Sequence, residues 1–284
     1  MIDEHARHVP PARLRPFVSG YTGYRQEGVA PLRHRGLPSP ELTFIVTLDD
    51  PLAIDAHPDP RQPAESYDTL LGGLHTSPAL VSHQGRWSGV QLGLTPLGAR
   101  ALLGLPAAGL ANWDAEATDV IGGFAAQLRE LVVEQPTWAG RFAVIDQLLE
   151  QRAAEGEADR RQTVRSEVGY AWRRLGQTQG GVRVAELAAE TGLSTRRLGS
   201  LFQDEFGLAP KDAGRVFRFT HARRRIGQAA MGTGTTFARL AAECGFYDQA
   251  HLAREFRALA GCPPSVWLAE EFRFVQASAA DLGE

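Results

Sequence analysis

The chain has 284 residues, 43% of them hydrophobic and 22% charged, and its formal net charge at pH 7 is −3. These values are typical of about two globular domains with apolar cores. No apolar run reaches the roughly 18 residues of a membrane span, which excludes a membrane-spanning class. The two cysteines, Cys244 and Cys262, are too few for a disulfide framework, so we expect buried thiols and a cytoplasmic protein.

The charge is unevenly distributed along the chain. Residues 166–266 carry 14 Arg and Lys against nine Asp and Glu, a balance of +5, which leaves −8 for the remainder. A basic segment joined to an acidic one is typical of a nucleic-acid-binding module attached to another domain.

Residues 1–155 are predicted to form a first domain of α+β type. Up to about residue 94, β-type runs are separated by Gly and Pro turns, as in a small sandwich or barrel. Helical patterns then extend over 95–153, and helix 137–153 carries an apolar stripe that fits either a packed core or a dimer seam. The predicted strands are 42–48, 67–73, 79–85 and 87–94, and the two longer helices are 118–133 and 137–153.

The second half of the chain is predicted to be all helical. Residues 156–165 are small and charged without periodicity, so they form the predicted linker. Residues 166–272 form the second domain, and residues 273–284 form a C-terminal tail. The predicted helices are 164–176, 182–190, 195–205, 211–230, 237–243, 248–259 and 264–271.

An internal repeat lies within this second domain. The run "AELAAETG", which starts at residue 185, recurs as "ARLAAECG" 53 positions later. After the glycine the offset becomes 54, and Leu198 and Phe202 then match Leu252 and Phe256. A match that persists through a single shift indicates equivalent structural positions, so each copy is one supersecondary unit.

Each copy has the pattern of a helix-turn-helix. A short helix ends at a glycine, Gly192 or Gly245, which supplies the left-handed backbone of a tight helix end. The second helix turns a Leu and a Phe four residues apart inward and leaves its other face free to enter a DNA major groove. The predicted units span 182–206 and 236–260. Helix 211–230 between them is about 30 Å long, close to the roughly 34 Å that separates successive major grooves on one face of DNA.

At the level of whole motifs, residues 166 to about 270 resemble the DNA-binding domain of the AraC/XylS family of bacterial transcription regulators. The residues that carry the resemblance are "LAAETGLSTRRLGSLFQDEFGLAPK", "ARRRI" and "LAAECGFYDQAHLAREFRALAGCPPS". The resemblance implies a regulator that binds promoter DNA through two helix-turn-helix units. Such a regulator binds in the bacterial nucleoid, and it contacts RNA polymerase if it is an activator.

The resemblance also implies which exposed side chains touch DNA. Arginine recognises guanine and glutamine recognises adenine through paired hydrogen bonds, whereas phosphate contacts fix register without reading sequence. The predicted base-reading residues are Arg196, Ser200, Gln249, His251 and Arg254. The predicted phosphate contacts are Ser194, Thr195, Lys211, Thr236 and Arg257.

The N-terminal half resembles the sensor domain of one branch of the same family. The runs "HRGLPSPELTFIVTL", "LLGGLH" and "GVQLGLTPLGARALLGLP" carry this likeness. It implies a cupin-like β-barrel or sandwich with a helical appendage, a homodimer through helix 137–153, and control by a small-molecule effector or a partner. The sequence does not identify the ligand-binding residues.

Two other classes of function stay open at this point. The first is an enzyme fused to a DNA-binding module, such as a repair protein, and the second is a protein–protein scaffold. His34, His57, His75 and His83 lack the spacing of a metal site, and no catalytic arrangement of Ser, His, Asp or Cys stands out. We therefore expect no catalytic residue, no metal and no cofactor.

Overall fold

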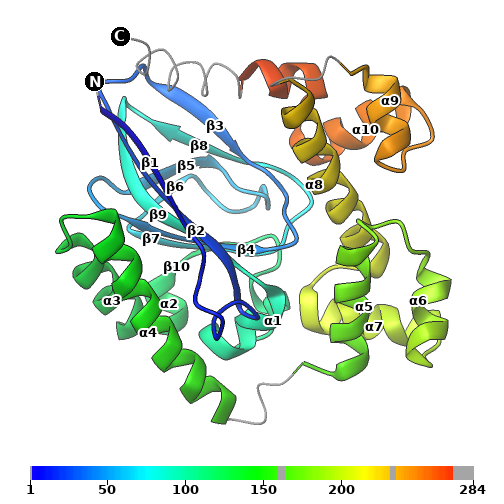
Figure 1. Cartoon of the computed structure of the whole chain (residues 1–284), viewed down its shortest axis with the longest axis horizontal. Helices are drawn as coiled ribbons and strands as arrows, with labels where there is room; N and C mark the ends of the chain where they lie inside the picture. The colour runs from blue at the N-terminus through cyan, green and yellow to red at the C-terminus, as the bar shows by residue number, and fades with distance from the viewer. Residues whose placement is uncertain (1, 159–163, 231–234, 271–284) are drawn as a thin grey trace.

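The computed structural model describes residues 2–158, 164–230 and 235–270. Strands fill most of the N-terminal half, and helices make up the C-terminal half, where the long helix α8 (Pro210–Ala230) joins two groups of shorter helices (Figure 1). None of the described helices is long and apolar enough to cross a membrane.

The strands form two antiparallel sheets rather than one closed barrel. The strand order is β1-β2-β9-β4-β7-β10 in the first sheet and β3-β8-β5-β6 in the second, and no ladder joins them within the described residues. The first sheet comprises β1 (Ile2–His8), β2 (Val18–Glu27), β9 (Arg86–Leu94), β4 (Leu42–Thr47), β7 (Thr69–Gly72) and β10 (Asp114–Glu116). The second comprises β3 (Leu32–Gly36), β8 (Ala79–His83), β5 (Leu52–Ala56) and β6 (Glu65–Tyr67).

The two faces of the first sheet pack against different parts of the molecule. Successive side chains of a strand point to opposite faces, so Phe44 and Val46 of β4 belong to a large core shared with helices, whereas Ile45 belongs to a small cluster between the sheets. That small cluster fills only part of the space between the sheets. A barrel, one of the two architectures expected for this region, therefore does not close, and the open sandwich leaves room for a cavity.

Helices cover the outer face of the first sheet. The segment predicted as one helix, 118–133, is two, because Gly122 breaks it with a φ of 59°. The helix predicted over 137–153 runs longer and takes in the first three residues of the predicted linker. The rest of that linker lies largely outside the described residues. These elements are α1 (Pro96–Gly98), the π-helical turn η1 (Ala99–Leu103), the 3₁₀ turn η2 (Ala107–Leu110), α2 (Ala117–Ile121), α3 (Gly123–Val133) and α4 (Trp138–Ala158).

The apolar stripe of α4 is packed inside the chain. Phe142, Ile145 and Leu149 are at most 4% exposed and belong to the same core as the first sheet. Phe142 stacks on His8 and Tyr21 from β1 and β2. Of the two interpretations of the stripe, the structure therefore shows the packed core.

The C-terminal region is helical as predicted. Each predicted helix is present, with ends that differ by at most two residues where the structure describes them, and residues 264–270 form a last helical segment. The predicted tail, 273–284, lies outside the described residues. The remaining helices are α5 (Ser166–Gln177), α6 (Val184–Thr191), α7 (Thr195–Phe206), α9 (Phe237–Glu243) and α10 (Gln249–Ala260).

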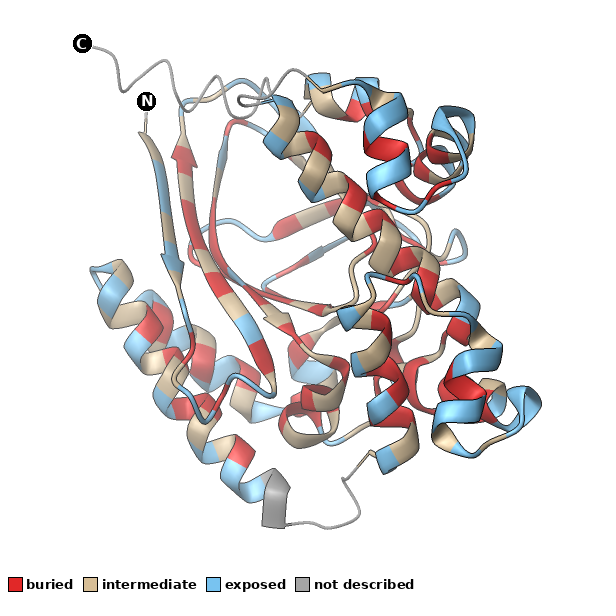
Figure 2. Ribbon diagram, turned by 45° about the vertical axis from the view of Figure 1, so that its right-hand side comes forward, coloured by how far each residue is buried: buried red, intermediate tan, exposed pale blue. Residues whose placement is uncertain are grey.

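Two separate cores hold this helical region. Helices α5, α6 and α7 share one continuous core with the first sheet and α4, through side chains such as Trp172, Phe202 and Phe206. Helices α9 and α10 instead pack on the second half of α8, around Phe219 and Phe256. Buried and partly buried residues alternate along most of α8 (Figure 2).

Candidate nucleic-acid interface and ligand cavity

Helices α6 and α7 form the first helix-turn-helix unit. Gly192 ends α6 in the left-handed conformation, with a φ of 69°, and Ser194 caps α7 by accepting a hydrogen bond from the N–H of Arg197 at 3.2 Å. Leu198 and Phe202 are fully buried, which leaves the opposite face of α7 in solvent. These positions are those that the repeat predicts.

Helices α9 and α10 form the second unit, and the structure explains the shift in the repeat. Asp248 caps α10 through the N–H of His251 at 2.6 Å, as Ser194 caps α7. Between the turn glycine and the cap there is one residue in the first unit but two in the second. The extra residue is Tyr247, whose side chain is 92% exposed. The turn thus absorbs the insertion without changing either helix.

Three arginines around the second unit are held in ion pairs. Arg215 pairs with Glu255 at 2.8 Å, and Arg225 and Arg239 both pair with Glu243. The pairs of Arg215 and Arg225 join α8 to α10 and to α9, whereas the pair of Arg239 lies within α9. The remaining cations therefore define the interface.

The predicted DNA-contacting residues fall on the free faces of the two units. Of the ten, only His251 is half-buried and the other nine are exposed. Arg196, Arg254, Arg257 and Lys211 make no ion pair or hydrogen bond with any described residue. Ser194 and Thr236 accept cap hydrogen bonds, yet each hydroxyl still has a proton to donate to a phosphate. The structure thus leaves nine of the ten side chains exposed and one half-buried, and their contact with DNA stays a prediction.

His251 differs from the other nine because its ring is held by its own helix end. Its Nδ1 accepts a hydrogen bond from the N–H of Tyr247 at 3.2 Å, and its ring packs edge-on against Phe246. An accepting Nδ1 leaves Nε2 as the protonated nitrogen of the neutral ring. Only this N–H is then available to a base.

Three further exposed residues lie on or next to α7 and α10 and were not among the predicted DNA contacts. Tyr247 stands at the turn before α10, and Arg197 and Ala250 lie in the first turns of α7 and α10. Aligning the two copies at the offset of 54 places Ala250 opposite Arg196, so the repeat itself held the signal for that position.

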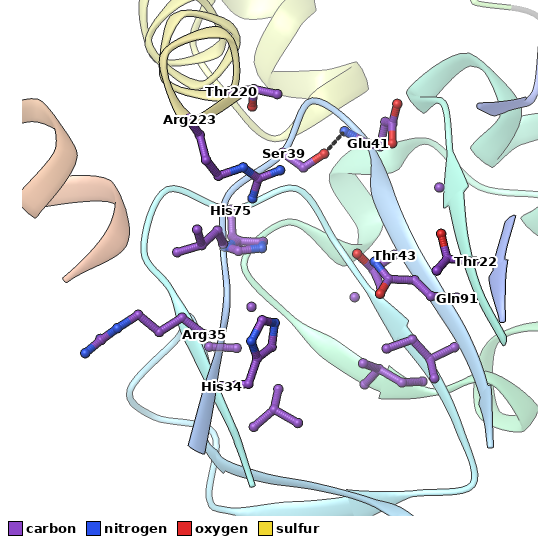
Figure 3. Close-up of a pocket in the computed structure, with 18 of the residues that line it drawn as sticks. Thr22, His34, Arg35, Ser39, Glu41, Thr43, His75, Gln91, Thr220 and Arg223 are labelled. Carbon is purple, nitrogen blue, oxygen red and sulfur yellow. Dashed lines mark hydrogen bonds between the residues drawn. The ribbon is translucent and has the colours of Figure 1, made fainter. Parts of the chain in front are cut away.

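A cavity of about 810 Å³ lies between the two sheets and is roofed by α8. The sheets provide apolar walls, including Ile45, Ile54 and Val81, and Thr220 and Arg223 reach in from α8 (Figure 3). The last helical segment adds Trp267 and Leu268. The cavity therefore touches both the N-terminal sandwich and the helix that joins the two reading units. Sequence periodicity carried no signal for it, since the lining comes from segments that extend from His5 to Leu268.

The cavity has a polar end near α8. Burial and the neighbouring charge of Arg223 lower the pKa of His34 to about 4, so its ring is neutral at pH 7. Burial also lowers the pKa of His75 and raises the pKa of Glu41. These shifts all disfavour charge on the walls, whereas Arg223 provides a cation. No cluster of three or more metal-ligating side chains occurs in the described residues.

The sandwich contacts both helix-turn-helix units, but unequally. Arg100 of η1 forms a two-pronged ion pair with Glu205 of α7 at 2.8 and 2.7 Å, and Gly207 lies against Ala108 and Ala111 beside η2. The second unit is linked through the more exposed pair of Arg35 and Glu270 at 2.9 Å. The first unit is therefore the more firmly attached.

Comparisons with known proteins show which domain and which solved structures this chain is similar to. Residues 187–270 match the family of the helix-turn-helix domain. None of the curated proteins compared with the chain matches it. The structure is similar to that of ToxT from Vibrio cholerae, with 11% identity, a TM-score of 0.51 and coverage of 88% of this chain and 97% of that one. It is similar also to unsaturated fatty acid-bound ToxT from strain SCE256, with 10% identity, a TM-score of 0.50 and coverage of 87% and 94%.

A further match covers a smaller part of the chain. A probable AraC family transcriptional regulator from Rhodopseudomonas palustris CGA009 is 28% identical over 37% of this chain and 96% of its own, with a TM-score of 0.33. The fold shared with ToxT joins a β-rich domain to a helical domain, as observed here. The match over residues 187–270 identifies the C-terminal part of the chain as a helix-turn-helix domain, and the similarity to ToxT concerns the fold.

Proposed function

We propose that the chain regulates transcription by placing α7 and α10 in successive major grooves of a promoter. The observation that carries the proposal is the pair of exposed, partner-free arginines, Arg196 and Arg254, on equivalent helices at the two ends of α8. With 21 residues, α8 is about 32 Å long, which matches one turn of DNA.

The ten predicted contacts divide by chemistry. Arg196, Ser200, Gln249, His251 and Arg254 face the base edges, and the Nε2–H of His251 offers its hydrogen bond to an acceptor. Ser194, Thr195, Lys211, Thr236 and Arg257 bind phosphates and fix the register. Ser194, Thr195, Lys211 and Thr236 lie at helix N-termini, where the helix dipole also favours phosphate, whereas Arg257 lies in the last turn of α10.

The cavity beneath α8 is the proposed effector site. Apolar walls that lead to a cation favour an amphiphile with a carboxylate, whose charge would lie at Arg223 and whose chain would lie between the sheets. Solved structures of ToxT contain an unsaturated fatty acid and (E)-4-(8-methylnaphthalen-1-yl)but-3-enoic acid, both of this chemical class. An effector held there would touch the sandwich and α8 at once, and so would bias how the second reading unit is presented.

Homodimerisation through α4 completes the proposal. Because the apolar stripe is buried inside the chain, a dimer would use the opposite, exposed face, which carries Ala139, Ala143, Gln147 and Gln151. If the protein is an activator, RNA polymerase is a further partner. Both thiols are buried and free, and we assign the chain no catalytic role.

DNA binding is tested by selecting ligands of the full-length protein from random duplexes at about 50 and 200 mM salt. We expect a two-part motif with parts about one helical turn apart. Lys211→Ala should weaken binding to all sequences and lower the salt dependence by about one counterion. Binding that is blind to sequence in wild type would refute the proposal.

The effector site is tested by titrating the protein with oleate and, as a control without a carboxylate, oleyl alcohol. We expect oleate to raise the melting temperature and to change affinity for the selected duplex, and oleyl alcohol to do neither. Arg223→Gln should abolish the oleate response, whereas Arg257→Gln, on the exposed face of α10, should keep it. An equal response to both lipids would refute recognition of the carboxylate.

A further inference from the structure

The two recognition helices can be superimposed residue by residue from their ends. Both α7 and α10 have 12 residues, both are capped by a side chain that accepts the N–H of the third helical residue, and both end at a left-handed glycine. Leu198 and Phe202 of α7 take the buried positions that Leu252 and Phe256 take in α10. The offset of 54 therefore gives structurally equivalent positions along the whole of both helices.

The outer faces of the two helices carry an arginine at different equivalent positions. In α7 the second residue is Arg196 and the sixth is Ser200, whereas in α10 the second is Ala250 and the sixth is Arg254. All four side chains are exposed. Residues four apart share one helix face, so each helix presents one long cationic and one small side chain to the groove, in opposite order.

Neither arginine is engaged elsewhere. Arg196 and Arg254 have no hydrogen bond or ion pair with any described residue, in contrast to Arg215, Arg225 and Arg239 of the same domain. Each guanidinium is thus free to bind O6 and N7 of a guanine, the commonest specific contact in the major groove.

The displacement along the helix can be converted into base pairs. Four residues of α-helix rise about 6 Å, and successive base pairs of B-DNA are about 3.4 Å apart. A recognition helix that follows the groove therefore carries the arginine about two base pairs further in the second unit than in the first.

We propose that each half-site of the operator carries one guanine at a different place. When the two half-sites are aligned through the equivalent positions of α7 and α10, the guanine of the second lies about two base pairs from that of the first. At the base of the second half-site that is equivalent to the guanine of the first, the protein presents Ala250, whose methyl group fits the methyl of thymine. Two equal units in tandem would read a direct repeat. These units read two different half-sites, so the operator is not an exact direct repeat. The inference rests on the proposed function, since it specifies what the same DNA-reading faces recognise.

The test is to exchange the two side chains within one helix. The double variant Arg196→Ser/Ser200→Arg gives α7 the arrangement of α10, and Ala250→Arg/Arg254→Ala gives α10 the arrangement of α7. Both changes lie on exposed faces, and circular dichroism and melting temperature check that the variants fold as wild type does. Motifs are then selected from random duplexes with wild type and with each variant.

We expect the first variant to move the guanine by about two base pairs in one half-site and to leave the other unchanged. The second variant should move the guanine in the other half-site only. The affinity of the first variant for the wild-type motif should fall about tenfold or more, and a duplex with the displaced guanine should restore it.

The outcomes separate this inference from the proposal on which it rests. If wild type selects no motif, both the DNA-reading function and the inference are wrong. If wild type selects a two-part motif but the exchanged variants leave the guanine in place, or move it in both half-sites, only the inference is overturned.

Discussion

The two helix-turn-helix units are near copies in sequence, yet they are held in the molecule in different ways. The first unit shares one continuous apolar core with the sandwich and is fixed to it by the buried Arg100–Glu205 pair. The second has a core of its own and meets the sandwich across the cavity and through the Arg35–Glu270 pair. A repeat thus determines the internal structure of each unit but not its attachment.

The long helix α8 contacts both the core of the second unit and the cavity. Its residues Phe219, Ala222 and Ile226 are buried in the core of the second unit. On the adjoining face, Thr220 and Arg223 line the cavity. A ligand in the cavity therefore acts on the helix face next to the second unit's core, and we expect the first unit to keep its position on the sandwich.

The largest effect is expected from opening the second core. Phe256 is 1% exposed and contacts the rings of Phe219 and Trp267. Phe256→Ala should destabilise this unit by about 3–5 kcal/mol. Hydrogen exchange should show lost protection in α9 and α10, with α5, α6 and the first sheet still protected. The equivalent Phe202→Ala should instead lower protection in the first unit and the sandwich together. Equal losses everywhere in both variants would contradict the division into two cores.

The ion pairs provide a second test of the attachment. Arg100 and Glu205 have side chains 23% and 9% exposed, so Arg100→Met leaves a carboxylate poorly solvated and should cost about 3–5 kcal/mol in thermal or urea unfolding. Arg100→Met/Glu205→Met should recover much of that loss. Arg35→Met breaks the more exposed pair with Glu270 and should cost under about 1 kcal/mol. If Arg35→Met were the more damaging change, the second unit would be the anchored one.

A smaller effect concerns acidification. The folded pKa of His34, about 4, lies below its ordinary value of 6.5 because of burial and then the charges of Arg223 and His83, while Glu270 acts in the opposite direction. Between these two values the unfolded chain binds the proton and the folded chain does not, so stability falls as pH drops from about 6.5 towards 4. Melting temperatures across this range should fall less steeply in His34→Gln than in wild type. An unchanged slope would mean that His34 is not the group responsible.

The sequence predicted the helical domain well because a local pattern determines it. Turn glycines, caps and inward Leu and Phe residues lie within 25 residues of one another, and a second copy confirmed each position. The sandwich was harder to predict. Strands β1, β2, β3 and β5 lack a clear alternation of apolar and polar residues, and Gly122 interrupts what reads as one helix.

The candidate functional residues show the same contrast between local pattern and tertiary fold. The side chains proposed to face DNA could be named from the repeat, since they occupy the positions that packing leaves free. The cavity could not, because Ile45, His34, Arg223 and Trp267 come from four distant segments that only the tertiary fold brings together. The hydrogen bond from the backbone N–H of Tyr247 to Nδ1 of His251 likewise depends on a one-residue insertion. The sequence does not show the geometry of this insertion.

The smallest expected effect uses the two helix caps, which perform one structural task with different charge. Ser194 caps α7 as a neutral hydroxyl, whereas Asp248 caps α10 as a carboxylate at the end of the helix proposed to enter the groove. Asparagine caps about as well as aspartate, so Asp248→Asn should leave stability unchanged while it removes a charge that repels phosphate. Two unit charges 10 Å apart in water interact by about 0.4 kcal/mol, so binding to a non-operator duplex should tighten by roughly twofold. Fluorescence anisotropy at about 50 mM salt should detect the change, and it should shrink at 200 mM because the ions screen exposed charges. Asp248→Ser, which removes the same charge and also caps a helix, is the matched control and should tighten binding as much. Tightening in Asp248→Asn alone would mean that the amide group, and not the loss of charge, causes the effect.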